Sequence, residues 1–186
     1  MPSYVALLRA INVTGRFIKM ADLSAHFAAL GYADARTFIN SGNVTFSSRT
    51  RSADALARGL EAGLEPLLGF KSEVFVRGVP DMQAIVQRAA ALRSQVSDGG
   101  DLNVIFSAKR FTSAQREAVL ALRSEHDEWE LGERELYWLS RLPQHLSKVS
   151  NAVLERRLKC RLTLRRASML QRLATQLAAP PIDGLA

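Results

Sequence analysis

Near its N-terminus the chain reads LLRAIN, over residues Leu7–Asn12, and this stretch decides the fold. It belongs to an apolar run that starts at Tyr4, and such a short run is typical of a buried β-strand. The run does not alternate between apolar and polar residues, so we expect both faces of the strand to be covered. Arg9 interrupts the run. Because an unpaired buried guanidinium costs several kcal/mol, Arg9 must meet a partner, water or a ligand.

Strand-like runs and helical spacing alternate through the rest of the first half. The expected elements, in chain order, are a strand at 4–11, a helix at 20–30, strands at 36–40 and 43–48, a helix at 52–68 and a strand at 73–77. The two middle strands meet at Ser41–Gly42, which we interpret as a two-residue hairpin in which glycine supplies a positive φ. The order β-α-β-β-α-β is typical of ferredoxin-like folds.

The same order recurs after a helix that follows Pro80 and a linker at Ser97–Asp101. The expected elements are a strand at 102–106, a helix from Thr112, a hairpin of 129–131 and 135–139, a helix at about 147–159, a strand at 161–164 and a final helix ending at Pro180–Pro181. We therefore predict an α+β protein of two tandem ferredoxin-like (βαββαβ) domains. The first, residues 1–96, includes the linking helix; the second, residues 101–186, includes a C-terminal helix. Each is small, so we expect them to pack together.

Composition and charge narrow the class of protein. The chain of 186 residues is 47% hydrophobic and 23% charged, which is ordinary for one globular domain or two small ones. Its net charge is +7, and both ends are basic around a mildly acidic middle. This asymmetry suggests an anionic partner, although the many arginines also fit a compositional bias. We interpret Glu128, Glu130, Glu133 and Glu135 of the second hairpin as a solvated edge that blocks sheet association.

Four motifs carry a resemblance to a known family. They are YVALLRAINV at Tyr4–Val13, Lys19 with M-x-x-L at Met20–Leu23, SGNVTF at Ser41–Phe46 and TLRR at Thr163–Arg166. The chain thereby resembles the domain of unknown function 1697 family over essentially its whole length. The family shows Y-x-A-L-L-R-G-I-N-V-G-G, S-G-N-V-x-F and T-x-R-N. The resemblance implies a tandem ferredoxin-like fold, in agreement with the pattern above, and it implies no reaction.

The chain departs from the family pattern at three positions. Ala10 and Thr14 stand where the pattern has glycine, and Arg166 stands where it has asparagine. Glycine allows a ligand to approach the backbone closely. If the family's glycines serve that purpose, this chain binds the ligand less well or binds a different one.

Polar residues in the motifs predict a site for a small anionic ligand bearing phosphate or carboxylate. The candidate binding residues are Arg9, Asn12, Lys19, Ser41, Gly42, Asn43 and Arg165. Asn12 at a strand exit and Lys19 ahead of a helix sit where backbone amides favour negative charge. Arg9 and Arg165 carry the forked donors that such anions prefer. The alternative for Arg9 is a structural tie to backbone carbonyls between the two copies. We favour a non-enzymatic binding protein.

Nucleic acid is the alternative partner. The basic C-terminal residues are Arg156, Arg157, Lys159, Arg161, Arg166 and Arg172. They have no interleaved aromatic residues, so they suit a phosphate backbone without sequence readout. The competing interpretation is a solvated helix face whose arginine stems cover apolar surface.

Catalysis, metals and membranes receive little support from the sequence. The three histidines and the lone Cys160 show no metal-ligand spacing, and we expect neither a metal nor a cofactor. No acid, base or nucleophile can be named, so enzymatic activity stays open. The sequence does not indicate the oligomeric state either. No apolar run is long enough for a membrane span, and the N-terminus does not resemble a signal peptide. A single cysteine fits a reducing cytoplasm, where we expect the protein to reside.

Overall fold

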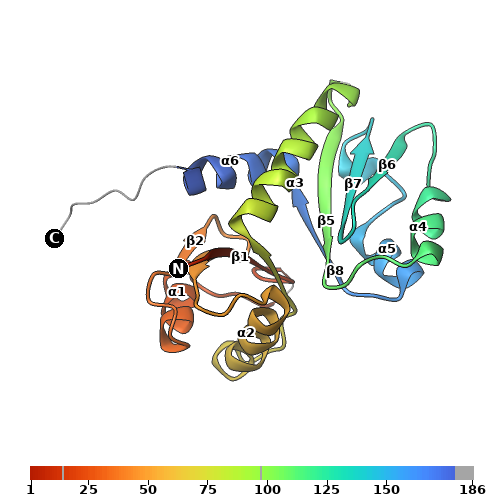
Figure 1. Ribbon diagram of the computed structural model, residues 1–186. Coiled ribbons are helices and arrows are strands. Elements are labelled where there is room, and N and C mark those ends of the chain that lie inside the picture. The colour runs from red at the N-terminus through yellow and green to blue at the C-terminus, as the bar shows by residue number, and fades with distance from the viewer. Residues whose placement is uncertain (14, 97, 179–186) are drawn as a thin grey trace.

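The computed structural model describes residues 1–13, 15–96 and 98–178 (Figure 1). The first half contains β1 (Ser3–Leu8), α1 (Met20–Ala29), β2 (Arg36–Phe38), β3 (Asn43–Ser47), α2 (Ala53–Leu68), β4 (Val74–Gly78) and α3 (Val79–Leu92). A short 3-10 turn, η1 (Arg93–Gln95), follows. The second half contains β5 (Asp101–Ser107), α4 (Ser113–Leu120), β6 (Asp127–Leu131), β7 (Glu135–Ser140), η2 (Gln144–Leu146), α5 (Asn151–Leu158), β8 (Leu162–Arg166) and α6 (Ala167–Ala178). The predicted features at Thr14, Ser97 and Pro180–Pro181 lie outside the described residues.

The predicted α+β class is confirmed. The described residues form two four-stranded antiparallel sheets and six α-helices, an arrangement compatible with two tandem α/β domains. The strand order is β2-β3-β1-β4 in the first sheet and β6-β7-β5-β8 in the second. Leu8 at the end of β1 lies opposite Val74 of β4, and Ser107 at the end of β5 lies opposite Leu162 of β8. Leu8 and Ser107 therefore occupy corresponding places in the two halves.

The first strand is covered on both faces, as its apolar run predicts. Ala6 and Leu8 pack beneath α1 and α2, whereas Val5 and Leu7 face the other half of the molecule. Each of the four is at most 1% exposed. Full burial of one leucine contributes about 1.5–3 kcal/mol, so this strand anchors two cores at once.

The core between the halves is built around α3 and α6, which lie side by side in Figure 1. Met82 and Ile85 of α3 and Leu170 and Leu173 of α6 pack together with the inner faces of both sheets. The predicted inward face of the linking helix is confirmed by Met82 and Ile85 and by their neighbours Val86 and Ala89.

The hairpin at the Ser41–Gly42 corner is wider than the two-residue turn predicted. Phe38 pairs with Asn43, so the loop comprises the four residues Ile39–Gly42. The amide of Asn43 donates to the carbonyl of Phe38 (3.2 Å) and to Oγ of Ser41 (2.6 Å), which closes the wider loop. Ile39 also adopts a left-handed conformation there, with φ of 49°. Side-chain hydrogen bonding therefore replaces the tighter turn.

We expect Gly42→Ala to lower the free energy of unfolding by about 2–4 kcal/mol, measured by equilibrium urea denaturation. Gly42 has a φ of 68°, and an added Cβ would lie 2.9 Å from Cβ of Ile11 and 3.1 Å from Cβ of Leu8. The matched control is Gly59→Ala in α2, where an added Cβ meets nothing within 4 Å. That helical substitution should stabilise by about 0.5–1 kcal/mol. Equal effects of the two substitutions would contradict the crowding argument.

Candidate functional site

Arg165 of β8 crosses from the second half into the first and is only 9% exposed. Its N–H groups all donate to protein acceptors: Nε to Oδ1 of Asn43 (2.7 Å), Nη1 to Oγ1 of Thr163 (2.8 Å) and the carbonyl of Leu164 (2.9 Å), and Nη2 to the carbonyls of Leu8 (2.9 Å) and Ser41 (3.0 Å). A guanidinium has five such donors, so its hydrogen-bonding capacity is used in full. Burial lowers the pKa of Arg165 to about 10, and the group therefore stays charged at neutral pH.

Arg77 of β4 makes the reciprocal crossing, from the first half into the second. Its Nε donates to Oε1 of Glu135 (2.7 Å), and its Nη2 donates to the carbonyls of Ser107 (2.9 Å) and Arg134 (3.3 Å). Burial lowers the pKa of Arg77, although the charge of Glu135 opposes that shift. The interpretation of Glu135 as part of a solvated edge is wrong, because its residue is 9% exposed and its carboxylate meets this arginine.

The two arginines follow one pattern. Each is the fourth residue of the last strand in its half, and each donates to the carbonyl of the residue before it. Each also donates to the last residue of the other half's first strand, Leu8 or Ser107. Its Nε meets the first residue of the other half's third strand, Asn43 or Glu135. The halves therefore exchange arginines in a twofold fashion.

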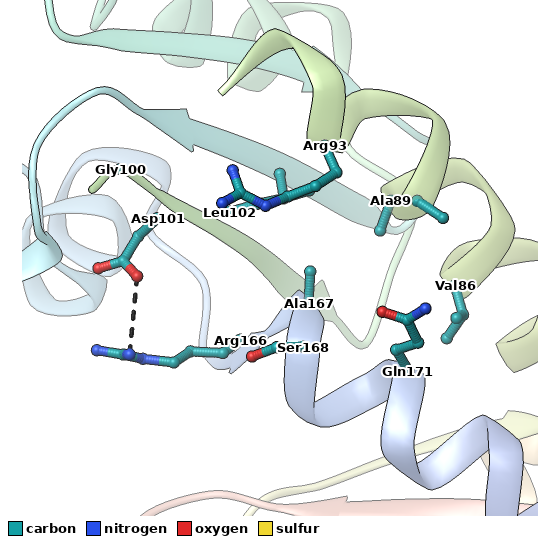
Figure 2. Close-up of a pocket in the computed structure, with 11 residues that line it drawn as sticks. Val86, Ala89, Arg93, Gly100, Asp101, Leu102, Arg166, Ala167, Ser168 and Gln171 are labelled. Carbon is teal, nitrogen blue, oxygen red and sulfur yellow. Dashed lines mark ion pairs between the residues drawn. The ribbon is translucent and has the colours of Figure 1, made fainter. Parts of the chain in front are cut away.

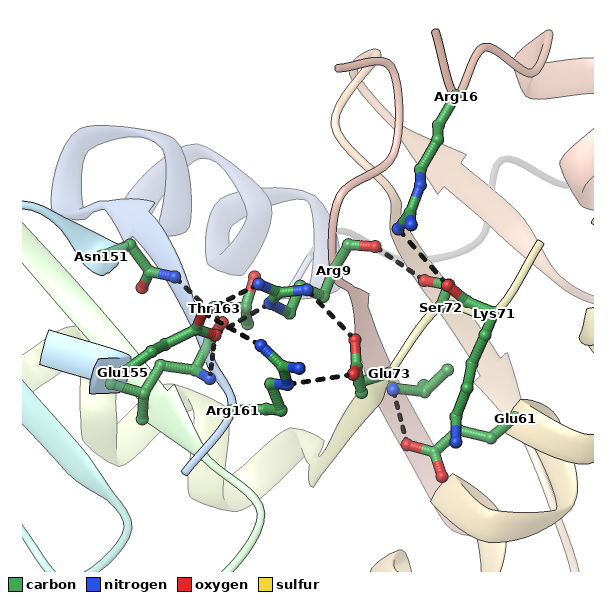
Figure 3. Close-up of polar contacts among 12 residues, drawn as sticks. Arg9, Arg16, Glu61, Lys71, Ser72, Glu73, Asn151, Glu155, Arg161 and Thr163 are labelled. Carbon is green, nitrogen blue, oxygen red and sulfur yellow. Dashed lines mark hydrogen bonds and ion pairs between the residues drawn. The ribbon is translucent and has the colours of Figure 1, made fainter. Parts of the chain in front are cut away.

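Arg9 also ties the two halves together, through carboxylates rather than the carbonyls considered as its alternative partners (Figure 3). Its Nε and Nη2 donate to Oε1 and Oε2 of Glu155 (2.9 and 2.8 Å), and its Nη1 donates to Oε2 of Glu73 (3.3 Å). Arg161 adds longer ion pairs to Glu73 (3.6 Å) and Glu155 (3.8 Å). Burial alone would lower the pKa of Arg9, but Glu155 and then Glu73 raise it above its ordinary value.

The remaining predicted anion-site residues divide between two places. Ser41, Gly42 and Asn43 lie at the seam between the halves, where Ser41 and Asn43 hold Arg165. Asn12 and Lys19 line a different, open hollow of about 810 Å³ next to α1. There Asn12 donates to the carbonyl of Asn40 (3.3 Å) and accepts from the backbone N–H of Ile18 (2.9 Å).

A cleft of about 470 Å³ opens between the two halves beside the Arg9 network. Its cationic lining residues are Lys109, Arg110, Lys159 and Arg161, and its other lining residues include Glu61, Glu73, Val74, Phe75, Ala108 and Cys160. Arg110 pairs with Glu133 at 3.1 Å on the exposed surface. Burial raises the pKa of the Cys160 thiol, so it is protonated at neutral pH rather than a ready nucleophile. Of the cationic lining residues, the sequence analysis named Lys159 and Arg161, but it predicted that they contact nucleic acid.

The six basic residues predicted to contact nucleic acid fall into separate groups. Arg156, Lys159 and Arg161 line a hollow at the end of α5. Arg157 on the same helix donates through Nε to the carbonyl of Ala118 (3.1 Å). Arg166 pairs with Asp101 at 3.7 Å, and the Arg172 guanidinium lies over the Phe38 ring, 5.9 Å from its centroid.

A smaller pocket of about 190 Å³ lies between α3, the start of β5 and the start of α6 (Figure 2). Arg93, Ser168 and Gln171 line it together with the Asp101–Arg166 ion pair. Of these residues, the sequence singled out only Arg166.

The described residues lack a metal-binding cluster and a membrane-spanning helix. No group of three or more His, Cys, Asp or Glu side chains that could hold a metal ion occurs among them. Within the same part of the chain, no helix is long and apolar enough to cross a membrane.

The fold and the seam define a two-lobed α+β protein whose halves exchange buried arginines. The chain belongs to the family described as protein of unknown function (DUF1697), whose model matches residues 1–137. The chain is also similar in structure to a conserved bacterial protein, SP0830 from Streptococcus pneumoniae. The TM-score is 0.74 at 22% sequence identity, over 96% of this chain and 99% of that one, and this likeness shows the fold. No curated protein matches the chain.

The departure at Ala10 has a structural explanation. Ala10 adopts a φ of 57°, in the left-handed region that favours glycine. The glycine of the resembled pattern thus suits the backbone conformation of this position without any appeal to a ligand. The departure at Arg166 places a long side chain, 61% exposed, beside Asp101.

We expect Arg165→Lys to lower the free energy of unfolding by about 3 kcal/mol, because an ammonium cannot reach acceptors spread over five positions. Its neighbour provides the control: Arg166→Lys alters a side chain that is 61% exposed and should change stability by less than about 0.5 kcal/mol. Urea denaturation of both variants measures the difference. Similar losses in the two variants would argue against a seam that depends on the buried guanidinium.

Proposed function

We propose that the protein is a non-enzymatic binding protein for a small anionic ligand bearing phosphate or carboxylate, and that the ligand occupies the cleft between the halves. The observation that carries this proposal is the convergence of Lys109, Arg110, Lys159 and Arg161 on that cleft. Ligand sites often form between packed lobes, because the junction of two lobes is concave.

The proposed position of the ligand differs from the position that the sequence predicted. Arg9 and Arg165 were predicted to hold the ligand, but their donors are committed to Glu73, Glu155 and the acceptors of the seam. Binding an anion there would require breaking those bonds.

Two of the four cleft cations are better placed to meet a ligand, whereas Arg110 pairs with Glu133 and Arg161 lies in longer ion pairs with Glu73 and Glu155. Neither Lys109 nor Lys159 makes an ion pair within the part of the chain that the structure describes. Thr112, the N-cap of α4, also lines the cleft, so the N-terminus of that helix lies at the cleft.

We further propose that each half is a ferredoxin-like domain, with residues 1–96 and 101–186 as the two units. The support is the shared antiparallel strand order, with the first strand central between the third and fourth in each sheet. The free thiol of Cys160 supports a reducing, cytoplasmic environment. Nucleic-acid binding stays a prediction, because the basic residues assigned to it lie in separate groups.

Titration calorimetry with pyrophosphate and citrate tests the anion proposal. We expect binding that weakens with salt and that falls about tenfold in the Lys109→Gln/Lys159→Gln double variant, since each charge contributes part of the attraction. Lys148→Gln is the control, because Lys148 is exposed and does not line the cleft. The proposal is wrong if neither anion binds, or if the double variant binds as well as the control. Tighter binding of a DNA duplex would favour the nucleic-acid alternative.

A further inference from the structure

The cleft between the halves has a structural counterpart in the neighbouring Arg9 site. The backbone N–H of Leu162, the first residue of β8, donates to Oε1 of Glu155 on α5 (2.8 Å). The backbone N–H of Val74, the first residue of β4, donates to Oε1 of Glu61 on α2 (2.9 Å). The two glutamates therefore correspond, each on the second helix of its half and each at the start of its last strand.

The residue that faces each glutamate differs between the two sides. Arg9 follows Leu8, and Ala108 follows Ser107 at the corresponding position. Arg9 reaches across the seam and binds Glu155 with two parallel hydrogen bonds of 2.9 and 2.8 Å. Ala108 has only a methyl group and reaches no such partner.

The open cleft is thus the unfilled copy of the Arg9 site. Ala108 and Glu61 both line it. Oε1 of Glu61 accepts the N–H of Val74, and within the described residues its Oε2 has neither a hydrogen bond nor an ion pair. Glu61 therefore presents a free carboxylate oxygen where its counterpart Glu155 holds a guanidinium.

The charges of the cleft are mixed rather than uniformly positive. Glu61 and Glu73 line it together with Lys109, Arg110, Lys159 and Arg161. Glu73 is already paired with Arg9 and Arg161, so a ligand with negative charge alone would face repulsion mainly from Glu61, which opposes the attraction of the cations. A ligand that carries both signs of charge satisfies both sets.

We propose that the cleft binds a small zwitterion of the basic amino acid class, with a guanidinium or ammonium group on Glu61 and a carboxylate on Arg161, Lys159 and Lys109. The ligand's cation then takes the place that the Arg9 guanidinium has in the filled copy. Val74 and Phe75 line the same cleft and accommodate an aliphatic stem between the two charges. This inference rests on the proposed function and adds that the anionic ligand also carries a cation.

Ala108→Arg in the full chain tests the correspondence directly. The new guanidinium should reach Glu61 as Arg9 reaches Glu155, so the melting temperature should rise and binding of free L-arginine should fall at least tenfold. Ala108→Met adds similar bulk without charge and should not raise the melting temperature. Combining Ala108→Arg with Glu61→Gln should remove the gain. A melting temperature that does not rise in Ala108→Arg, or that rises equally in Ala108→Met, would overturn the correspondence.

Calorimetry with L-arginine, L-citrulline, agmatine and inorganic phosphate tests the ligand class. We expect L-arginine to bind at least tenfold more tightly than citrulline, which lacks the guanidinium charge, and than agmatine, which lacks the carboxylate. Glu61→Gln retains an acceptor for Val74 and should reduce that preference over citrulline, and it should strengthen phosphate binding because a repelling carboxylate is removed.

The outcomes separate this inference from the proposed function. Phosphate binding without a preference for arginine over citrulline sinks the inference and leaves the anion proposal standing. Agmatine bound as tightly as arginine, with no binding of phosphate, pyrophosphate or citrate, overturns the anion proposal and the role of the ligand carboxylate, and supports only the contact with Glu61. If none of the four compounds binds, this inference fails, and if pyrophosphate and citrate do not bind either, both proposals fail.

Discussion

A charged guanidinium cannot be buried without partners, and this constraint governs how the two halves meet. Arg77 and Arg165 each leave one sheet and use acceptors at the strand ends of the other. Those acceptors are in place only when the other half is folded. The apolar packing of α3 and α6 joins the halves as well, but apolar contacts are not directional. The arginines specify the orientation of the two halves, because a planar guanidinium can donate hydrogen bonds only to oxygens in a few arrangements.

Much of the fold was predictable from the sequence because its signals are local. The run at Tyr4–Leu8, the glycine at Gly42 and the helical spacing from Pro80 each report the conformation of their own segment. The hairpin was predicted too short, since the hydrogen bonds of the Asn43 amide that close its loop leave no pattern in spacing. Boundaries moved for a similar reason: α5 begins at Asn151, not near residue 147.

The site was less predictable, because the role of each residue depends on the groups that the opposite half brings next to it. Arg9 was singled out as a residue that needed a partner and Arg165 as a donor for an anionic ligand, yet nothing local to them says whether protein or ligand supplies their acceptors. Arg77 was not singled out and Glu135 was interpreted as solvated, since a lone arginine at a strand end and one of several hairpin glutamates resemble solvated residues. Ala108 carries no signal at all. Its significance appears only when strand register places it at the position of Arg9.

The exchanged arginines have a consequence for how such a chain closes on itself. A half that carries both an arginine and the acceptors for one is self-complementary, so two identical halves would satisfy each other about a symmetry axis and leave neither set exposed. Tethering the halves makes the union intramolecular, and each set of acceptors is then free to change alone. One now presents a carboxylate at Glu135 and the other an amide at Asn43. Because both sets of acceptors are occupied within one molecule, this contact leaves no unpaired surface through which further copies of the chain could polymerise.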